Sequence, residues 1–404
     1  MKIGVLAYGS LIDDPGAELR DVIVSTINNV KTPFRVEYAR SSQTRGGAPT
    51  LIPVDSGGAE VNAVVFVLRD DVSVEMAMDL VWRRETGKYG KEDRYRPKTQ
   101  PRENTVQVQT LSDFAQVKTV LYTWIGSNIE NLNGEELARL AIASVQSPDV
   151  PPGKDGISYL INAVRNQIET PLSNAYRQAI LRLTGTGDLP AALEHLTRAQ
   201  AVTAFCEDCV WARSIRTHFA ELFERNDRRH VLLQESAAQL FGDLNLVLID
   251  YLLLQQAKLL DPASSGKGKL NLTTNYLLTL NWTAETRAKL TAANDTLLQF
   301  KGKIQTARNQ LVAHTDLRTR LGTLTLGTFL EADEETFWNA LQEFVSAAHG
   351  EALGGPFEID ATMQGGDALS LLHRLADAVD YDDMTKGDPG LLQRRAEHRR
   401  FDRL

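Results

Sequence analysis

The first sixteen residues read MKIGVLAYGSLIDDPG, and the stretch that decides the fold is an apolar strand pattern running into Tyr8-Gly9-Ser10-Leu11. A glycine after a strand lets the backbone turn sharply and lets a ligand approach the amides without a Cβ in the way. Consecutive amides in such a turn form a concave donor surface suited to a carboxylate or a phosphate. An ordinary strand-to-loop turn has the same local sequence, so the rest of the chain must decide between the two interpretations.

The sequence pattern of the first part of the chain, to about residue 125, is typical of strands and turns. Runs rich in β-formers predict strands at 1–9, 34–42, 48–58, 59–68 and 117–126. One helix is predicted between them at 73–87, with Ser73 as its N-cap and Gly87 as its C-terminal stop. We therefore expect a mainly antiparallel curved sheet or barrel with helices packed on it.

From about residue 134 the pattern becomes helical. Amphipathic helices are predicted at 134–147, 156–168, 170–185, 187–200, 201–226, 229–260, 283–316, 333–353 and 365–380. In the third of these, Thr170 is expected as the cap and Pro171 as the first helical residue. The predicted fold class is α+β with two domains: a sheet domain with a helical extension at 1–200 and an all-α bundle at 201–385. A charged tail at 386–404 is predicted to be loosely held, with basic character suited to interaction.

Composition narrows the classes of function. The 404 residues are 43% hydrophobic and 24% charged, with a net charge of −8, which is ordinary for a globular protein and argues against a generally basic nucleic-acid binder. The N-terminus lacks the apolar core of a signal peptide. The longest apolar stretch, 244–260, is interrupted by Asp250 and Lys258, which favours a bundle helix over a membrane span. We expect a cytoplasmic protein with no membrane partner.

Four features of the first part occur in a fixed order. Tyr8-Gly9-Ser10-Leu11 comes first, RGGAPTLIP at 45–53 second, Glu85 near a helix end third, and Arg94-Tyr95-Arg96-Pro97 with Tyr122 last. In this order the chain resembles the gamma-glutamylcyclotransferase-like superfamily, and 155–193 resembles the helical extension of one bacterial branch. The resemblance covers about the first half of the chain. It departs at Asn62-Ala63, where the family has a glycine.

The resemblance implies a small γ-glutamyl substrate and the release of 5-oxoproline. Glu85 would be the catalytic acid and base, because the substrate α-amine must lose a proton before it attacks its own γ-carbonyl. Tyr8, Gly9, Ser10, Leu11, Tyr95 and Tyr122 would bind the substrate. No metal and no cofactor are required. Two alternatives stay open: Glu85 is part of a surface ion-pair cluster with Arg83 and Arg84, or the domain binds such a ligand without turnover.

A second group of residues lies near the end of a long predicted helix, in RNQLVAH at 308–314. Arg308 and His314 are six positions apart, which is about 120° around a helix axis and about 9 Å along it. They do not share one face, although two copies meeting across a two-fold axis could pool them. A polar helix end with His314 near the C-terminus explains the same pattern.

The surroundings of this motif, at about 205–384, resemble HEPN domains of the abortive-infection type. That resemblance implies an R-x(4–6)-H motif at Arg308 and His314 with a polar Asn309, a metal-independent ribonuclease site at a homodimer interface, and RNA as a partner. Lys301, Lys303, Arg308, Arg318 and Arg320 are expected to supply a cationic groove. The alternatives to the cyclotransferase hypothesis are a toxin-like defence ribonuclease with the first domain as sensor or modifier, and a non-catalytic interaction protein.

Two smaller patterns have structural interpretations. Cys206 and Cys209 are one helical turn apart and are expected on a buried helix face rather than at a zinc or redox site. Trp211, Trp282 and Trp338 are expected to fill the bundle core.

Overall fold

The chain forms two compact units, Met1–Thr197 and Arg198–Leu404. The computed structural model describes residues 2–100, 102–147, 149–265, 269–307, 331–360 and 366–398. The boundary falls inside one long helix, α7 (Leu189–Phe223), where the sequence predicts two helices meeting at residue 200. That prediction is wrong because nothing between Leu196 and Cys206 favours a break in a helix.

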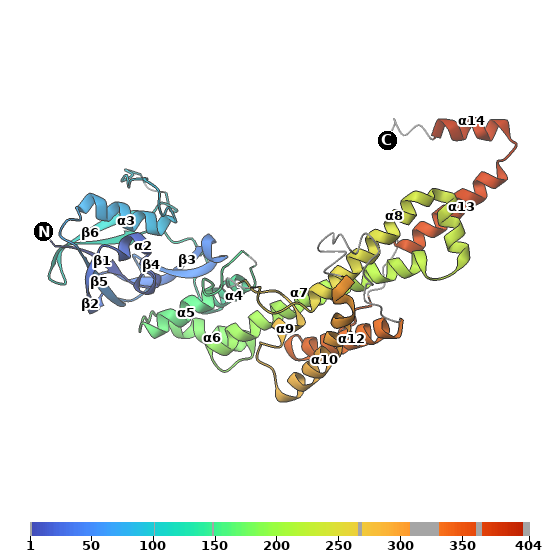
Figure 1. Cartoon of the computed structure of the whole chain (residues 1–404). Coiled ribbons are helices and arrows are strands. Elements are labelled where there is room, and N and C mark those ends of the chain that lie inside the picture. The colour runs from blue at the N-terminus through green and yellow to red at the C-terminus, as the bar shows by residue number, and fades with distance from the viewer. Residues whose placement is uncertain are drawn as a thin grey trace. The chain divides into compact units, whose positions relative to one another are not determined.

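The first unit is built on a mixed sheet (Figure 1). Its strands are β1 (Ile3–Ala7), β2 (Ile23–Lys31), β5 (Asn62–Leu68), β6 (Gln107–Phe114) and β7 (Val117–Trp124), in the order β2-β5-β1-β7-β6. β1 pairs antiparallel with β5 and parallel with β7, and the β2–β5 and β6–β7 pairs are antiparallel. A separate antiparallel hairpin contains β3 (Val36–Ser42) and β4 (Ala48–Pro53). The mainly antiparallel sheet is confirmed, with one parallel pair at its centre.

The sequence did not predict β2 and β6, and both are edge strands. Most positions of β2 and β6 are exposed or only partly buried. An edge strand needs no continuous apolar run, and polar residues there discourage pairing with another chain. The strands found from the sequence are the ones whose residues are buried.

Helices cover the sheet and the hairpin in separate layers. Helix α3 (Val74–Thr86) packs on β1, β6 and β7, and its buried Ala77, Leu80 and Val81 join the core on that face. Helices α4 (Gly134–Val145), α5 (Gly156–Arg165) and α6 (Ser173–Thr184) form another core with the hairpin. Two one-turn helices, α1 (Ser10–Asp13) and α2 (Ala17–Arg20), follow β1.

The predicted caps of α3 are confirmed, whereas the predicted start of α6 is wrong. The Ser73 hydroxyl accepts the Met76 amide at 3.1 Å, and Gly87 ends α3 with φ 66°. Helix α6 begins at Ser173, after Leu172, and not at Pro171. The Ser173 hydroxyl bonds back to Thr170, so the hydroxyl pair closes a turn in front of the helix.

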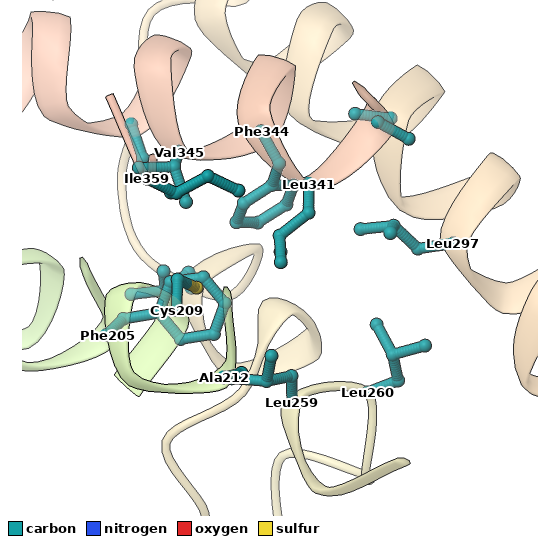
Figure 2. Packing of buried hydrophobic residues seen from close by; sticks show 14 of the residues in the cluster. Phe205, Cys209, Ala212, Leu259, Leu260, Leu297, Leu341, Phe344, Val345 and Ile359 are labelled. Atoms are coloured by element: carbon teal, nitrogen blue, oxygen red, sulfur yellow. The ribbon is translucent and has the colours of Figure 1, made fainter. Parts of the chain in front are cut away.

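The second unit is helical. After α7 it contains α8 (Asp227–Leu259), α9 (Thr274–Leu277), α10 (Ala284–Ala307), α12 (Glu331–Ala352), α13 (Ala368–Met384) and α14 (Pro389–His398). Its main core joins α7, the end of α8, α9, α10 and α12, and Figure 2 shows Phe205 and Cys209 of α7 packed with Phe344 of α12. Both cysteines are buried in this core, as predicted. Helix α14 lies in the segment predicted as a loosely held tail.

Helix α8 is unusual in its exposure. Leu240, Leu246 and Val247 are each at least 60% exposed, and the helix has a non-helical residue at Ala237. Among the described helices, α8 is the one long and apolar enough to cross a membrane, and 17% of its most apolar window is buried.

Trp211 of α7 does not lie in the bundle core. Its side chain is 52% exposed and donates its indole N–H to the Tyr251 hydroxyl at 2.9 Å, so the predicted core position is wrong.

Candidate functional site

A cavity of about 460 Å³ lies within the first unit, between the end of β1, the end of α3 and the β3–β4 hairpin. Its volume is in the range of small-ligand sites. The described residues that line it are Tyr8, Ser10, Leu11, Asp14, Arg40, Ser42, Thr44, Arg45, Thr50, Leu51, Ile52, Pro53, Arg84, Glu85, Thr86, Gly87, Tyr89, Val106, Thr123, Ile125, Pro151, Lys154 and Tyr159. Tyr8, Ser10, Leu11 and Glu85, which the sequence predicts to act together, therefore surround one space.

Gly9 shows why the first strand ends on a glycine. It precedes α1 with φ 57° and ψ −135°, a conformation that side chains strongly disfavour. A Cβ at this position would lie 2.5 Å from the Tyr159 hydroxyl oxygen. The sharp turn requires glycine, as the sequence predicts. The close approach seen here is that of Tyr159 of the protein itself, and the predicted approach of a ligand stays a prediction.

The Tyr159 hydroxyl fixes this corner of the cavity. It accepts the Leu51 amide at 3.2 Å, so α5 is tied to β4 directly behind Gly9. The Arg45 guanidinium carbon lies 5.0 Å from the centre of the Tyr159 ring. Burial raises the pKa of Tyr159, so the hydroxyl stays neutral. The sequence does not single out Tyr159, because its stretch, GISYLINAV, has the pattern of an ordinary amphipathic helix.

Glu85 is held by its neighbour in the chain. Arg84 donates to the Glu85 carboxylate at 2.6 Å, to the Asp14 carbonyl at 2.7 Å and to the Ser10 hydroxyl at 3.3 Å. Burial alone would lower the pKa of Arg84, but the Glu85 carboxylate outweighs it and the pKa is raised. The guanidinium thus stays charged and connects the end of α3 to the loop after β1.

Tyr8 lines the same cavity as this carboxylate. Burial raises the pKa of its phenol strongly, and the charge of Glu85 adds to this effect. Its hydroxyl is 3.5 Å from the Thr123 carbonyl, at the long limit of a hydrogen bond. A neutral phenol with a weakly held hydroxyl can donate to a substrate oxygen. The Leu11 amide, expected to face a ligand, is 3.4 Å from the Tyr8 carbonyl.

Two predicted substrate-binding tyrosines are not among the described residues that line the cavity. The Tyr95 hydroxyl accepts the Val108 amide at 3.0 Å, and its ring packs near Trp82. Tyr122 stacks on Phe34 at 4.6 Å between ring centres, and Phe34 in turn meets the edge of Tyr8. Tyr95 thus supports β6, and Tyr122 is connected to Tyr8 through Phe34.

The second predicted site cannot be placed in the same way. Arg308, Asn309 and His314 lie outside the described residues, as do Arg318 and Arg320. The two described lysines of the predicted groove are already paired: Lys301 with Asp261 at 3.2 Å and Lys303 with Asp333 at 2.6 Å. Positive charge for RNA would therefore have to come mainly from the arginines.

The described residues contain no group of three or more His, Cys, Asp or Glu side chains that could hold a metal ion. Cys206 and Cys209 are free thiols in the core. Burial raises the pKa of Cys206 to about 12 and that of Cys209 well above its usual range. Burial thus keeps both thiols in the neutral, weakly reactive form.

Residues 199–371 match the family model HEPN_AbiU2, which is described as AbiU2. The helical half of the chain is a HEPN-like domain. The match includes Arg308, Asn309 and His314, and it starts two residues after the boundary between the units. No curated protein matches the chain. The family comparison gives no cyclotransferase match for the first unit, so that resemblance remains a prediction.

Proposed function

We propose that the first unit is a gamma-glutamylcyclotransferase-like enzyme with Glu85 as its acid and base. The observation that carries this proposal is that Glu85 lines one cavity with Tyr8, Ser10 and Leu11, although it lies more than seventy positions after them in the sequence. The cavity offers a carboxylate, a neutral phenol and a guanidinium within one small volume. These groups suit a substrate that has an amine, a carboxylate and a reacting carbonyl.

The proposed reaction is an intramolecular acyl transfer. The substrate α-amine nitrogen forms a bond to the γ-carbonyl carbon, and the bond from that carbon to the leaving nitrogen breaks. Glu85 takes the proton from the attacking amine and returns it to the leaving amine. The products are 5-oxoproline and a free amine. Because attack is intramolecular, the cavity mainly has to hold the ring-closing conformation.

The loop after β1 and Arg84 would hold the glutamyl part of the substrate. Arg84 already reaches the Ser10 hydroxyl and the Glu85 carboxylate, so a substrate α-carboxylate near Ser10 would meet a fixed guanidinium. The neutral Tyr8 hydroxyl can donate to the oxygen that becomes negative when the amine attacks. Glu85 is then assigned proton transfer in addition to its ion pair with Arg84.

Replacing Glu85 tests the proposal. The Glu85→Gln substitution keeps the shape and removes the base, so 5-oxoproline release from γ-glutamyl dipeptides should fall by about 10² or more. Glu18→Gln is a matched control, because Glu18 is also a partly buried carboxylate paired with an arginine near the end of α3, Arg83, at 2.8 Å. The control should stay close to the wild-type rate. Release at the wild-type rate by Glu85→Gln would show that the assignment is wrong.

A second candidate function belongs to the HEPN-like domain and is favoured by the family match over 199–371. We infer a metal-independent ribonuclease site in which His314 moves the proton of a ribose 2′-hydroxyl and Arg308 holds the scissile phosphate. The full chain should then cleave RNA in the presence of a chelator. His314→Ala should abolish cleavage and keep much of the binding, whereas Arg308→Ala should weaken both. If the wild type cuts no RNA, the domain is better described as an interaction module.

A further inference from the structure

Helix α8 has a stripe of side chains that nothing in its own unit covers. Leu240, Asp243, Val247 and Asp250 are spaced three, four and three positions apart, so they lie along one side of the helix. Leu240 is 63% exposed, Val247 is 60% exposed, and both aspartates are exposed. Within the described part of the chain, neither aspartate has an ion-pair or hydrogen-bond partner. We call these four residues the α8 stripe.

The α8 stripe lies outside the core that this helix forms with its neighbours. Phe241 is buried with Leu372 of α13, and Leu244 and Leu248 pack against the same cluster. These three α8 residues are about 110° around the helix axis from the stripe. Two such stripes would repel each other, since each presents two aspartates, whereas a helix with leucines and arginines would suit this surface.

Helix α14 has the complementary character. Leu392 is 46% exposed and Arg394 is exposed, and neither Leu391 nor Leu392 belongs to a hydrophobic cluster of the described residues. Residues 389–404 contain five arginines and two carboxylates. An isolated helix of this length is only marginally stable in water. A surface that covers its leucines would therefore stabilise α14.

The turn between α13 and α14 is held by its own hydrogen bonds. Thr385 is 2% exposed, and its hydroxyl donates to the Tyr381 carbonyl at 2.8 Å. The Asp388 amide donates to the Thr385 carbonyl at 3.2 Å. In Figure 1, α14 continues beyond the end of α13 and away from α8. With this turn, the stripe that α14 can cover belongs to another copy of the chain.

We propose that α14 of one copy docks on the α8 stripe of a second copy, and that the contact is reciprocal across a two-fold axis. The leucines of α14 cover Leu240 and Val247, and its arginines pair with Asp243 and Asp250. The alternation of apolar and charged positions fixes the register of the two helices. The contact needs neither of the proposed activities, and it gives the basic end of the chain a binding surface.

The test reverses the charges on each side of the contact. One full-length variant carries Asp243→Arg and Asp250→Arg, and the other carries Arg394→Glu and Arg395→Glu. Sedimentation equilibrium of the wild type should give a dimer that weakens as salt rises, because exposed charges are screened. Each variant should raise the dissociation constant of the dimer by about 10²-fold or more, since attraction is replaced by repulsion at both copies of the contact.

Mixing the two variants is the decisive measurement. In the mixture, the unchanged α14 of the first variant meets the unchanged α8 of the second, and the two reversed helices also match in charge. The mixture should therefore form a dimer although each variant alone is monomeric, which also shows that both variants fold. The matched control reverses two exposed carboxylates of the first unit, Glu60→Arg and Asp70→Arg, and should keep the wild-type dissociation constant.

Four results overturn the inference. A wild type that is monomeric at micromolar concentration removes the contact between copies, and if it also binds phosphatidylcholine vesicles, a membrane covers α8 instead. Variants that keep the wild-type dissociation constant place the dimer contact on another surface. A mixture that stays monomeric means that the charge reversals act within one chain or on folding.

Discussion

Gly9→Ala tests the geometry of the site independently of any activity. Gly9 has φ 57° and ψ −135°, and an added Cβ would lie 2.5 Å from the Tyr159 hydroxyl oxygen. The hydroxyl would have to move away from Leu51, whose amide it accepts at 3.2 Å. The substitution therefore combines backbone strain with the loss of a buried hydrogen bond.

The expected cost has two parts. A non-glycine residue in this region of φ and ψ costs about 1–3 kcal/mol. A buried amide that loses its partner, here that of Leu51, costs about 1–3 kcal/mol more. We expect Gly9→Ala to lower the free energy of unfolding of the first unit by about 2–6 kcal/mol, a large part of the stability of an ordinary domain.

Gly87→Ala measures the cost of backbone strain without the cost of a lost hydrogen bond. Gly87 also has a positive φ, 66°, but nothing lies within 4 Å of the Cβ that would be added there. It should cost only the backbone strain, about 1–2 kcal/mol. Hydrogen exchange of the β1 and β5 amides in the full chain measures these differences within the first unit, without interference from the helical half.

A double-mutant cycle with Tyr159→Phe tests whether the close approach between Gly9 and Tyr159 causes part of the cost. Once the hydroxyl is gone, the next atom of residue 159 that the Cβ would meet is 3.5 Å away, an ordinary contact. Gly9→Ala should therefore cost about 1–3 kcal/mol less in the Tyr159→Phe background than in the wild type. If the two substitutions are additive, the close approach between Gly9 and Tyr159 does not exist.

Three further predictions follow from the packing. Burial raises the pKa of Glu37 from 4.5, so its stabilising contribution is present below 4.5 and is lost as the pH rises through the raised value. The melting temperature of Glu37→Gln relative to wild type should accordingly rise between about pH 4 and pH 7. Cys206 and Cys209 should react slowly with iodoacetamide in the folded protein and rapidly in urea. Sedimentation should give the mass of a homodimer, and Val247→Glu on the exposed face of α8 should shift it toward the monomer.

The elements that were predicted correctly are those whose local sequence and whose burial point to the same structure. Ser73 and Gly87 bound α3 as predicted because capping depends on the neighbouring backbone only. The edge strands β2 and β6 were missed because most of their residues are not buried and so show no strong apolar pattern. The exposure of Trp211 could not be predicted, since a tryptophan on an apolar helix has the same sequence pattern whether or not another helix covers it.

The candidate site was predictable only for residues with a local pattern. Tyr8 to Leu11 stand out as a glycine turn after a strand, and Glu85 stands out at a helix end before Gly87. Arg40, Lys154 and Tyr159 come from elements that show nothing unusual, and only the tertiary structure brings them to the cavity. The reverse holds for Tyr95 and Tyr122, which lie close in sequence to predicted features but support the sheet.

The stretch Arg83-Arg84-Glu85 shows why the two interpretations of Glu85 are not exclusive. From sequence, adjacent charges suggest a surface ion-pair cluster, and an ion pair does form. The two arginines differ, however, because Arg83 binds Glu18 at 2.8 Å whereas Arg84 binds Glu85 at 2.6 Å inside the cavity. Arg84 also holds the loop after β1 through Asp14 and Ser10, so it positions the Glu85 carboxylate and this loop together. An ion pair with no role beyond stability needs only its two partners. One that also fixes the loop across the cavity is what a site requires when it must place a proton acceptor against a bound amine.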